Sequence, residues 1–326
     1  MSPTVANAAA YVYVPSNDKG TVTVIDQATL KVIQTYPAGD LVQHVVPSWD
    51  LKTLYANVSG GNRLLPFDPV TGKPGQPIVV DAPYNLYFTP DGTSAIVMAE
   101  RRDRMDWYDP VTWKRVRAVS VPCKGVNHAD WSADEKWFLV TCEFSGSVLK
   151  VDTSTGAILG TLTLKRGAMP QDVRLTPDGT KFYVADMMAG GVWIVDGAKL
   201  AVSGFIPTGV GAHGIYPSRD AKVMYVSNRG HGGSHDHAGS VTVVDPTTGK
   251  VVANWPIPGG GSPDMGGVSA DGRVLWLSGR YDAVVYAIDT TTGAVTARIP
   301  VPDGPHGLCV FPQPGRYSLG HTGNYR

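Results

Sequence analysis

The chain has 326 residues, of which 43% are hydrophobic and 17% are charged, and its 28 Lys and Arg residues balance 28 Asp and Glu residues. The zero net charge argues against nucleic acid or an acidic membrane as a partner, because both attract proteins with a basic excess. No apolar run approaches the ~20 residues of a membrane-spanning helix, and 38 Gly and 25 Pro residues are typical of short strands joined by tight turns.

The start of the chain and the cysteines give little information. Residues 1–11 contain no leader segment in which basic residues are followed by apolar ones. We therefore expect either a periplasmic or secreted chain that has lost its leader, or a cytoplasmic protein. The three cysteines, Cys123, Cys142 and Cys309, form no Cys-x-x-Cys pair, and their odd number argues against a disulfide framework. We therefore expect buried or half-buried thiols.

An Asp recurs at the end of an alternating apolar segment and is followed by a turn. The seven copies are Asp26, Asp68, Asp109, Asp152, Asp196, Asp245 and Asp289. They are 42, 41, 43, 44, 49 and 44 residues apart. In such turns the carboxylate accepts hydrogen bonds from nearby backbone N–H groups, and a Gly takes positive φ. The spacing predicts a structural repeat of about 43 residues.

A second turn pattern lies within the repeats. It is Thr-Pro-Asp-Gly at residues 89–92 and 176–179, and Ser-Ala-Asp-Gly at 269–272. Two kinds of turn and the strands between them give four strands per repeat, which is the spacing of a β-propeller. We predict an all-β fold, a seven-bladed β-propeller with four antiparallel strands per blade, in which residues 1–326 form a single domain.

The innermost strand of each blade follows from the repeat. We expect these strands at residues 44–49, 85–90, 128–133, 172–177, 213–218, 265–270 and 306–312. Three strands at 11–37 precede the first of them, and 306–312 follows the last complete repeat, so the two ends should share one blade. This pairing would close the ring and leave no open sheet edge. We expect the tail at 317–326 near the top face, where the innermost strands begin.

Several strands carry a recurring Tyr-Val pattern. It is seen at residues 11–17 (Tyr-Val-Tyr-Val-Pro-Ser-Asn), 182–186 (Phe-Tyr-Val-Ala-Asp) and 225–228 (Tyr-Val-Ser-Asn). With its turns, nearly the whole chain resembles the YVTN-repeat propellers of the YncE-like and surface-layer type. That family includes surface proteins, DNA-associated periplasmic proteins and relatives of the haem-binding propellers of periplasmic nitrite reductases. The resemblance implies the seven-bladed fold and selects no single activity.

Histidines gather at one position of the repeat. Alignment on the turns places His44, Asn85, His128, Asp172, His213, Met265 and His306 at the start of the innermost strands, with Asp264 as the alternative to Met265. These side chains should face the central channel. Neutral imidazoles are good ligands for Cu, Zn, Ni and Fe, and Asp172 and Met265 add a harder and a softer ligand. The alternative is that the repeat favours a Pro-His-Gly turn here and that the imidazoles contact only water.

A His-rich loop follows His213. It carries His231, His235 and His237 between Gly230 and Gly239, and it is the insertion behind the 49-residue spacing. It is either a lid that adds a ligand or a proton relay, or a solvated insertion that binds metals without a role.

Polar residues also gather where the second strand of each repeat ends. They are Asn17, Asn57, Glu100, Glu143, Asp186, Asn228 and Arg280, with Arg101 and Arg229 adjacent. Most should satisfy N–H groups of the turns. Glu100 and Glu143 are candidates for acid/base catalysis, and Arg101, Arg229 and Arg280 are candidates for binding a polar or anionic ligand.

These patterns predict a metal-binding propeller, with copper favoured over zinc. The proposed ligands are His44, His128, His213 and His306, supported by the loop histidines and Asp172. A catalytic form would be a metal-dependent oxidoreductase or hydrolase. The alternative is a non-enzymatic module for a tetrapyrrole, held by an axial His with Arg residues on its carboxylates, or for a partner protein. We expect a small polar or anionic ligand in the channel mouth, no nucleic acid, no membrane span and a monomer.

Overall fold

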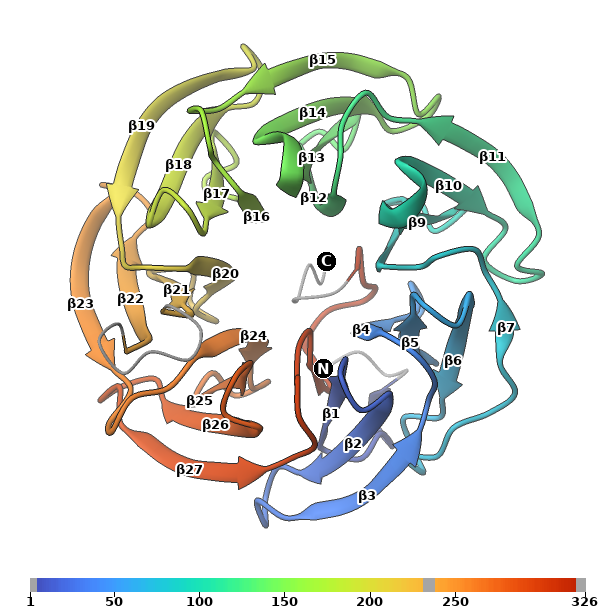
Figure 1. Cartoon of the computed structure of the whole chain (residues 1–326), viewed down its shortest axis with the longest axis vertical. Helices are drawn as coiled ribbons and strands as arrows, with labels where there is room; N and C mark the ends of the chain where they lie inside the picture. Colours follow the sequence, from blue (N-terminus) through green and yellow to red (C-terminus); the bar gives the residue numbers. More distant parts are fainter. Residues whose placement is uncertain (1–4, 231–237, 321–326) are drawn as a thin grey trace. The chain divides into compact units, whose positions relative to one another are not determined.

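The computed structural model describes residues 5–230 and 238–320. In these residues, strands form seven antiparallel sheets of four strands each (Figure 1). The sheets are the blades of a seven-bladed β-propeller, as the repeat predicted. Helical structure includes two short 3-10 turns, η2 (Glu100–Arg102) and η3 (Glu143–Ser145). No helix in the described ranges is long and apolar enough to cross a membrane.

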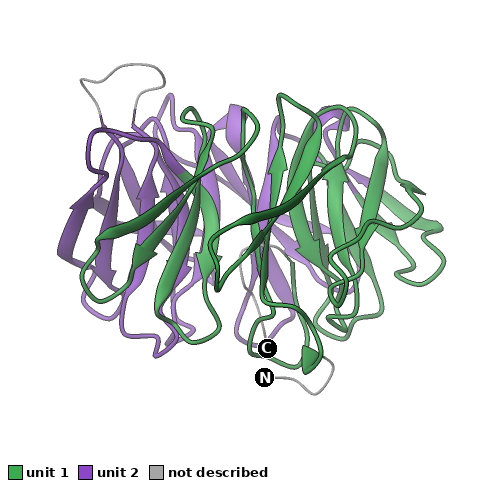
Figure 2. Cartoon of the chain, turned by 90° about the horizontal axis from the view of Figure 1, so that it is seen from below, with its two compact units in different colours: residues 1–99, 106–118, 264–326 green, residues 100–105, 119–263 purple. Residues whose placement is uncertain are grey.

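The chain divides into two compact units, which Figure 2 distinguishes by colour. Unit 1 comprises residues 1–99, 106–118 and 264–326, and unit 2 comprises residues 100–105 and 119–263. The complete blades of unit 2 are β12 (Val126–Trp131), β13 (Trp137–Cys142), β14 (Ser147–Asp152) and β15 (Ile158–Thr163); β16 (Pro170–Leu175), β17 (Phe182–Asp186), β18 (Gly191–Asp196) and β19 (Ala201–Pro207); and β20 (Ala212–Pro217), β21 (Met224–Asn228), β22 (Ser240–Asp245) and β23 (Lys250–Pro256).

Unit 1 holds the other four blades. Three of them are β4 (Val42–Pro47), β5 (Leu54–Val58), β6 (Arg63–Phe67) and β7 (Ile78–Val79); β8 (Asn85–Phe88), β9 (Ala95–Ala99), β10 (Arg104–Tyr108) and β11 (Arg115–Ser120); and β24 (Pro263–Val268), β25 (Val274–Gly279), β26 (Val284–Asp289) and β27 (Val295–Pro300). A few residues at the ends of β10, β11 and β24 are counted with unit 2.

The two ends of the chain share the fourth blade of unit 1. Its strands are β1 (Tyr11–Ser16), β2 (Thr21–Asp26), β3 (Val32–Pro37) and β28 (Cys309–Phe311). β28 pairs antiparallel with β1, and the side chain of Gln27 donates a hydrogen bond to the carbonyl oxygen of Phe311 at 2.9 Å. This confirms the predicted pairing of the termini.

The turns explain why the sequence repeats. Asp26, Asp109, Asp152 and Asp289 each accept hydrogen bonds from backbone N–H groups two and three residues ahead. These bonds lower the pKa of the four carboxyl groups. The turn after each first strand has its own pattern, in which a hydroxyl such as that of Thr89 donates to a carboxylate two residues ahead, Asp91, at 2.6 Å. Each hairpin is therefore fixed by local contacts.

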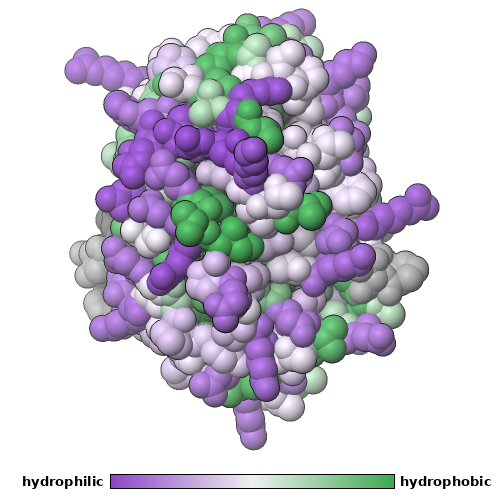
Figure 3. All heavy atoms as spheres, turned by 90° about the vertical axis from the view of Figure 1, so that its right-hand side faces the viewer, coloured by the Kyte–Doolittle hydropathy of each residue, from purple (hydrophilic) through white to green (hydrophobic). Residues whose placement is uncertain are grey.

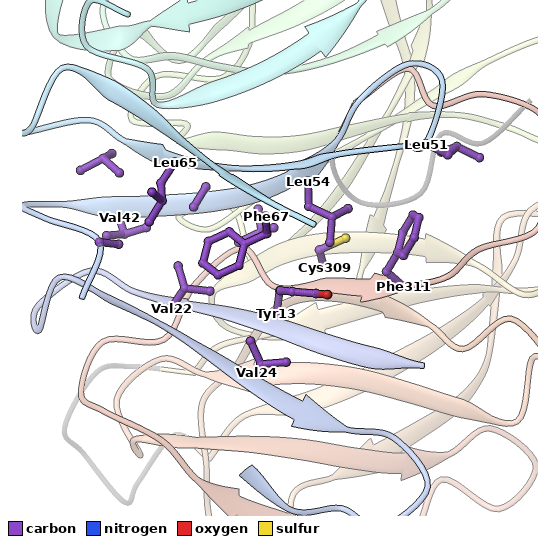
Figure 4. Packing of buried hydrophobic residues seen from close by; sticks show 14 of the residues in the cluster. Tyr13, Val22, Val24, Val42, Leu51, Leu54, Leu65, Phe67, Cys309 and Phe311 are labelled. Atoms are coloured by element: carbon purple, nitrogen blue, oxygen red, sulfur yellow. The ribbon is translucent and has the colours of Figure 1, made fainter. Parts of the chain in front are cut away.

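The core lies between the blades. In one cluster of unit 1, Phe67 of β6 packs edge-on against Tyr13 of β1, with ring centroids 5.8 Å apart, and Cys309 and Phe311 of β28 belong to the same cluster (Figure 4). The last strand of each blade is more exposed. Figure 3 shows the side of the molecule that carries β7 and β11, where apolar side chains gather among polar ones; Val79 of β7 is 85% exposed and Val116 of β11 is 63% exposed.

The structure corrects the expectation of three free thiols. Cys123 and Cys142 form a disulfide across 19 residues, and only Cys309, among the described cysteines, is a buried thiol. An odd number of cysteines is compatible with one disulfide and one free thiol, so the count alone could not reveal this pair. Its partners lie in the loop before β12 and at the end of β13, which the hairpin brings together.

The described part of the C-terminal tail lies away from the starts of the first strands. Tyr317 stacks on Trp49, with ring centroids 5.1 Å apart, and the backbone N–H of Phe88 donates to the carbonyl of Leu319. Trp49 follows β4 and Phe88 ends β8, so residues 317–320 pack where these strands finish. We expected the tail at the opposite end; residues 321–326 lie outside the described residues.

Candidate functional site

The proposed ligands lie just inside the first strands of the blades, not at their first residues. His44, His128 and Asp172 are the third residues of β4, β12 and β16, because each strand begins two residues earlier than predicted. Each lies in a β-bulge. In β4, for example, Val42 pairs with Val58 and Val45 with Ala56, so two residues face one residue of β5. A bulge of this kind changes the direction of a side chain and is often found near functional sites.

The bulge shows that the four histidines occupy two adjacent repeat positions. In β20, Ala212 pairs with Asn228 and Ile215 with Val226, so His213 is the first bulge residue and Gly214 the second. In the blade of the termini, Pro305 pairs with Ser16 and Val310 with Val12, so the four residues 306–309 face the three residues 13–15. His306 is likewise the first bulge residue and Gly307 the second. His44 and His128 are second residues. The alignment that gave the four a common position was therefore wrong by one residue for His213 and His306.

In unit 1, His44 and His306 lie side by side. A parallel backbone bridge joins His44 to Gly307, and the two imidazole centroids are 4.9 Å apart. Both residues are buried, with exposures of 0% and 4%. A side chain at Gly307 would not fit, because its Cβ would lie 1.7 Å from Nδ1 of His44.

Asp264 and Tyr84 complete this cluster. The Oδ2 atom of Asp264 lies 3.1 Å from Nδ1 of His306, and the hydroxyl of Tyr84 lies 3.4 Å from Nε2 of the same ring. The ring of Tyr84 also contacts His44 edge-on, with centroids 5.2 Å apart. Asp264 is fully buried, and a buried carboxylate requires a hydrogen-bonding partner. Nδ1 of His306 lies within ionic contact of this carboxylate, and Nε2 of the same ring faces the hydroxyl of Tyr84. We call these four residues the His44–His306 cluster.

In unit 2, His128 and His213 form a looser pair. Their ring centroids are 6.5 Å apart and the rings are almost perpendicular. The guanidinium of Arg229 lies 2.7 Å from Nε2 of His213. Because a guanidinium only donates, this nitrogen of His213 is the acceptor and the proton of the neutral ring is on Nδ1. The pair therefore offers a cationic group beside an imidazole.

Asp172 belongs to a buried ion pair. Its carboxylate accepts hydrogen bonds from the backbone N–H groups of Val173 and Ile215 and from Nε of Arg174. Arg174 in turn donates to the carbonyl oxygen of Ile215. Burial raises the pKa of Asp172 to about 6, although the charge of Arg174 opposes this shift. These contacts join β16 to β20 next to His213, which gives Asp172 a structural role in the described contacts.

Glu100 and Glu143 lie on the turns η2 and η3 of unit 2. Burial and the charge of Glu143 raise the pKa of Glu100 to about 8, so near pH 7 its carboxyl group is mostly protonated. Glu143 accepts a hydrogen bond from the side chain of Asn127 at 3.3 Å, and Asn127 precedes His128. This brings one of the predicted acid/base residues near the unit 2 imidazoles.

The remaining predicted residues are dispersed. Arg101 is exposed on η2, and Arg280 donates to the carbonyl oxygen of Gly304 at 3.0 Å. Met265 is fully buried, and its backbone N–H and carbonyl both bind the hydroxyl of Ser278. The loop residues His231, His235 and His237 lie outside the described residues. Among the residues that the structure does describe, no group of three or more His, Cys, Asp or Glu side chains is arranged to hold a metal ion.

The sequence analysis missed Tyr84 and treated Asp264 only as an alternative. Both lie five residues before the Ser or Thr of the following turn, as does His213: Tyr84 before Thr89, Asp264 before Ser269 and His213 before Ser218. Counting back five residues from this hydroxyl finds the first bulge residue in these three repeats, whereas His44 and His128, as second bulge residues, lie four residues before Ser48 and Ser132.

Comparison with known proteins supports the fold. The family model described as "YNCE-like beta-propeller" matches residues 2–316. No curated protein matches.

Similar solved structures come from several kinds of protein. A functionally unknown protein from Desulfotomaculum acetoxidans has a TM-score of 0.75 and 14% identity, with 94% of this chain and all of that chain covered. Hydrazine synthase from Kuenenia stuttgartiensis has a TM-score of 0.70 and 19% identity, with 82% and 89% covered. The dihydro-heme d1 dehydrogenase NirN, in complex with DHE, has a TM-score of 0.67 and 13% identity, with 94% and 76% covered. At such identities the likeness shows the fold alone.

Proposed function

We propose that this chain, which belongs to the family of YNCE-like beta-propellers, binds one transition-metal ion in the His44–His306 cluster, with copper favoured. The observation that carries the proposal is the arrangement around His306. Its Nε2 atom lies 3.4 Å from the hydroxyl of Tyr84. Two donors that each lie ~2.0–2.1 Å from one ion are about 2.8–3.4 Å apart for angles between 90° and the tetrahedral value, so this separation is compatible with a shared ion.

The donor set favours copper. Two imidazoles and a phenol provide nitrogen and oxygen ligands, and copper(II) binds such sets more tightly than the other divalent first-row metals. A site of this kind does not require a third His, Cys, Asp or Glu, which agrees with the absence of such groups among residues 5–230 and 238–320. Zinc is the alternative metal.

Each residue of the cluster has a defined task. His44 and His306 would hold the ion, Tyr84 would add an oxygen donor, and Asp264 would orient His306 through Nδ1. When bound, a copper ion supplies one-electron redox chemistry, so a metal-dependent oxidoreductase is the enzyme class that we propose.

The test is copper uptake by protein purified without a His tag. We expect one equivalent in calorimetry and elemental analysis, an electron paramagnetic resonance signal with coupling to two nitrogens, and a visible phenolate-to-copper band. Tyr84→Phe should remove only the visible band, whereas His44→Ala or His306→Ala should abolish the equivalent. Asp264→Asn should weaken binding about 10- to 100-fold.

Two controls isolate the cluster from other histidines. His128→Ala, and a variant without residues 231–237, should both retain the specific equivalent. If the wild type takes up no copper, zinc or nickel saturably, or if His44→Ala with His306→Ala binds as well as the wild type, the proposal is wrong.

A second candidate ligand is a tetrapyrrole with carboxylate groups, bound in unit 2. The observation that favours it is Arg229 beside His213, because arginine binds carboxylates well and a haem iron needs only one or two imidazoles. One protein of similar fold, NirN, is in complex with DHE. Titration with haemin should then give a Soret shift that His128→Ala removes and Arg229→Ala weakens. Absence of the shift in the wild type would rule this ligand out.

A further inference from the structure

A chain of linked turns forms one edge of unit 2. The backbone hydrogen bonds that link them are Val121 N–H to Asp103, Phe144 N–H to Lys124, Leu164 N–H to Gly146 and Met187 N–H to Met169. They place the turns at residues 100–103, 121–125, 143–146, 164–169 and 186–190 next to one another. Side chains from five separate parts of the sequence therefore share one surface.

Two apolar side chains project from these turns. Phe144 is 62% exposed and Met188 is 66% exposed. The turn of Lys165 and Arg166 lies between them, since Gly146 contacts Leu164 and Met187 contacts Met169. Aromatic residues, Met and Arg are the types enriched in protein–protein interfaces. Exposed Phe and Met on adjacent rigid turns therefore indicate a docking surface.

The same turns are basic. Arg101, Lys124, Lys165 and Arg166 are exposed, and of these only Lys124 forms an ion pair within the described ranges, with Asp103. Glu100, whose pKa is about 8, adds little negative charge at pH 7. We call Arg101, Lys124, Phe144, Lys165, Arg166 and Met188 the basic turn surface.

The disulfide makes this surface rigid. Cys123 and Cys142 join the turn of Lys124 to the end of β13, directly before the turn of Phe144. The hydroxyl of Ser145 also accepts a hydrogen bond from the backbone N–H of Lys124 at 2.8 Å. A surface that is already ordered loses less conformational entropy when a partner binds.

Unit 1 carries turns of opposite charge. Asp18, Asp40, Asp282 and Asp303 are exposed on turns between its strands, with Lys19 as the exposed cation paired to Asp303. The exposed aromatic Tyr281 stands beside Asp282. We call these four aspartates the acidic turn surface. The chain as a whole has zero net charge.

We infer that the basic turn surface of one copy docks onto the acidic turn surface of a second copy. A second copy provides the complementary charge that the basic turn surface requires, together with an aromatic side chain for Phe144 and Met188 to contact. An anionic membrane is the less suitable partner, because the chain has no net positive charge. This revises the expectation that the protein is a monomer.

The test is sedimentation velocity from about 1 to 100 μM, a range that detects dissociation constants of roughly the same size. We expect concentration-dependent association at low salt and its loss at ~0.5 M salt, where exposed charges are screened within a few ångströms. Lys165→Glu with Arg166→Glu should weaken association about tenfold or more, since like charges repel across an interface. Phe144→Ser should weaken it without changing the salt dependence. Lys250→Glu, an exposed charge on β23, is the matched control and should have no effect.

Mixing the two kinds of charge variant makes the inference specific. A copy with Lys165→Glu and Arg166→Glu keeps its acidic turn surface, and a copy with Asp18→Lys and Asp40→Lys keeps its basic turn surface, so the two should associate with each other although neither associates with itself. A wild type that stays monomeric at the highest concentration in low salt would overturn the inference, as would undiminished association of either charge variant. A monomer that instead binds vesicles of phosphatidylglycerol would assign the basic turn surface to lipid.

Discussion

Glu100 makes the stability of the fold depend on pH in a direction that is opposite to that of most carboxylates. Its pKa rises from 4.5 to about 8 because it is buried and lies near the charge of Glu143, with Arg101 opposing and Asp103 adding to the shift. Ionisation of this group therefore favours the unfolded chain, which releases the proton more readily. The full stability is present below pH 4.5 and is lost as the pH rises to 8.

The size of the effect follows from the two pKa values. At pH 7 an unfolded Glu100 is ionised and the folded one mostly is not, which costs about 3 kcal/mol of folding free energy. Above pH 8 the cost approaches about 5 kcal/mol. Glu100→Gln replaces the protonated carboxyl by a neutral group of the same shape, so it should remove this cost.

We expect the free energy of unfolding of Glu100→Gln to equal that of the wild type near pH 4.5 and to exceed it increasingly up to pH 9. Urea unfolding is the suitable assay, because guanidinium would screen the repulsion from Glu143. Glu143→Gln should move the titration of Glu100 to lower pH. Glu135→Gln, on a turn of the same unit, is the control. A difference between Glu100→Gln and the wild type that does not vary with pH would refute the reasoning.

Two further predictions concern unit 2. The double variant Cys123→Ser with Cys142→Ser should lower the free energy of unfolding by about 3 kcal/mol, because the unfolded chain regains the entropy lost by closing a loop of 19 residues. Urea unfolding under non-reducing conditions measures this change. An unchanged unfolding midpoint would show that the disulfide does not stabilise the fold. Asp172→Ala should lower the free energy of unfolding by about 3–5 kcal/mol, because it leaves the charge of Arg174 buried without its partner. A variant that combines Asp172→Leu with Arg174→Met should recover most of this loss. Equal stability of Asp172→Ala and the wild type would contradict the ion-pair assignment.

The fold could be predicted because local contacts repeat. Asp26 and its equivalents bind N–H groups two and three residues ahead, and Thr89 binds Asp91 two residues ahead. Such contacts are visible in any single turn of the sequence. The blade shared by the two termini could be predicted by counting strands, because three strands at one end of the chain and one strand at the other complete a four-stranded sheet.

The site was predicted only in part, because a β-bulge adds one residue that no local pattern reveals. A shift of one residue exchanges the sides of a strand. His44 and His128 are the second residues of their bulges, whereas in the repeat containing Gly214 the histidine, His213, lies one residue earlier, at the first bulge position. The pairs His44–His306 and His128–His213 and the disulfide depend on contacts between distant segments, which a single sequence does not show.

The steric environment of Gly307 gives a reason for the Pro-His-Gly segment that is independent of turn preference. Gly307 lies at the same bulge position as His44, and the two residues meet in a parallel bridge. A Cβ at Gly307 would lie 1.7 Å from Nδ1 of His44, so the imidazole occupies the space that a side chain would need. The glycine therefore allows His44 to lie against the backbone beside His306, whose ring Asp264 and Tyr84 contact. A turn preference alone accounts neither for this close approach nor for the fully buried carboxylate of Asp264 3.1 Å from Nδ1 of His306.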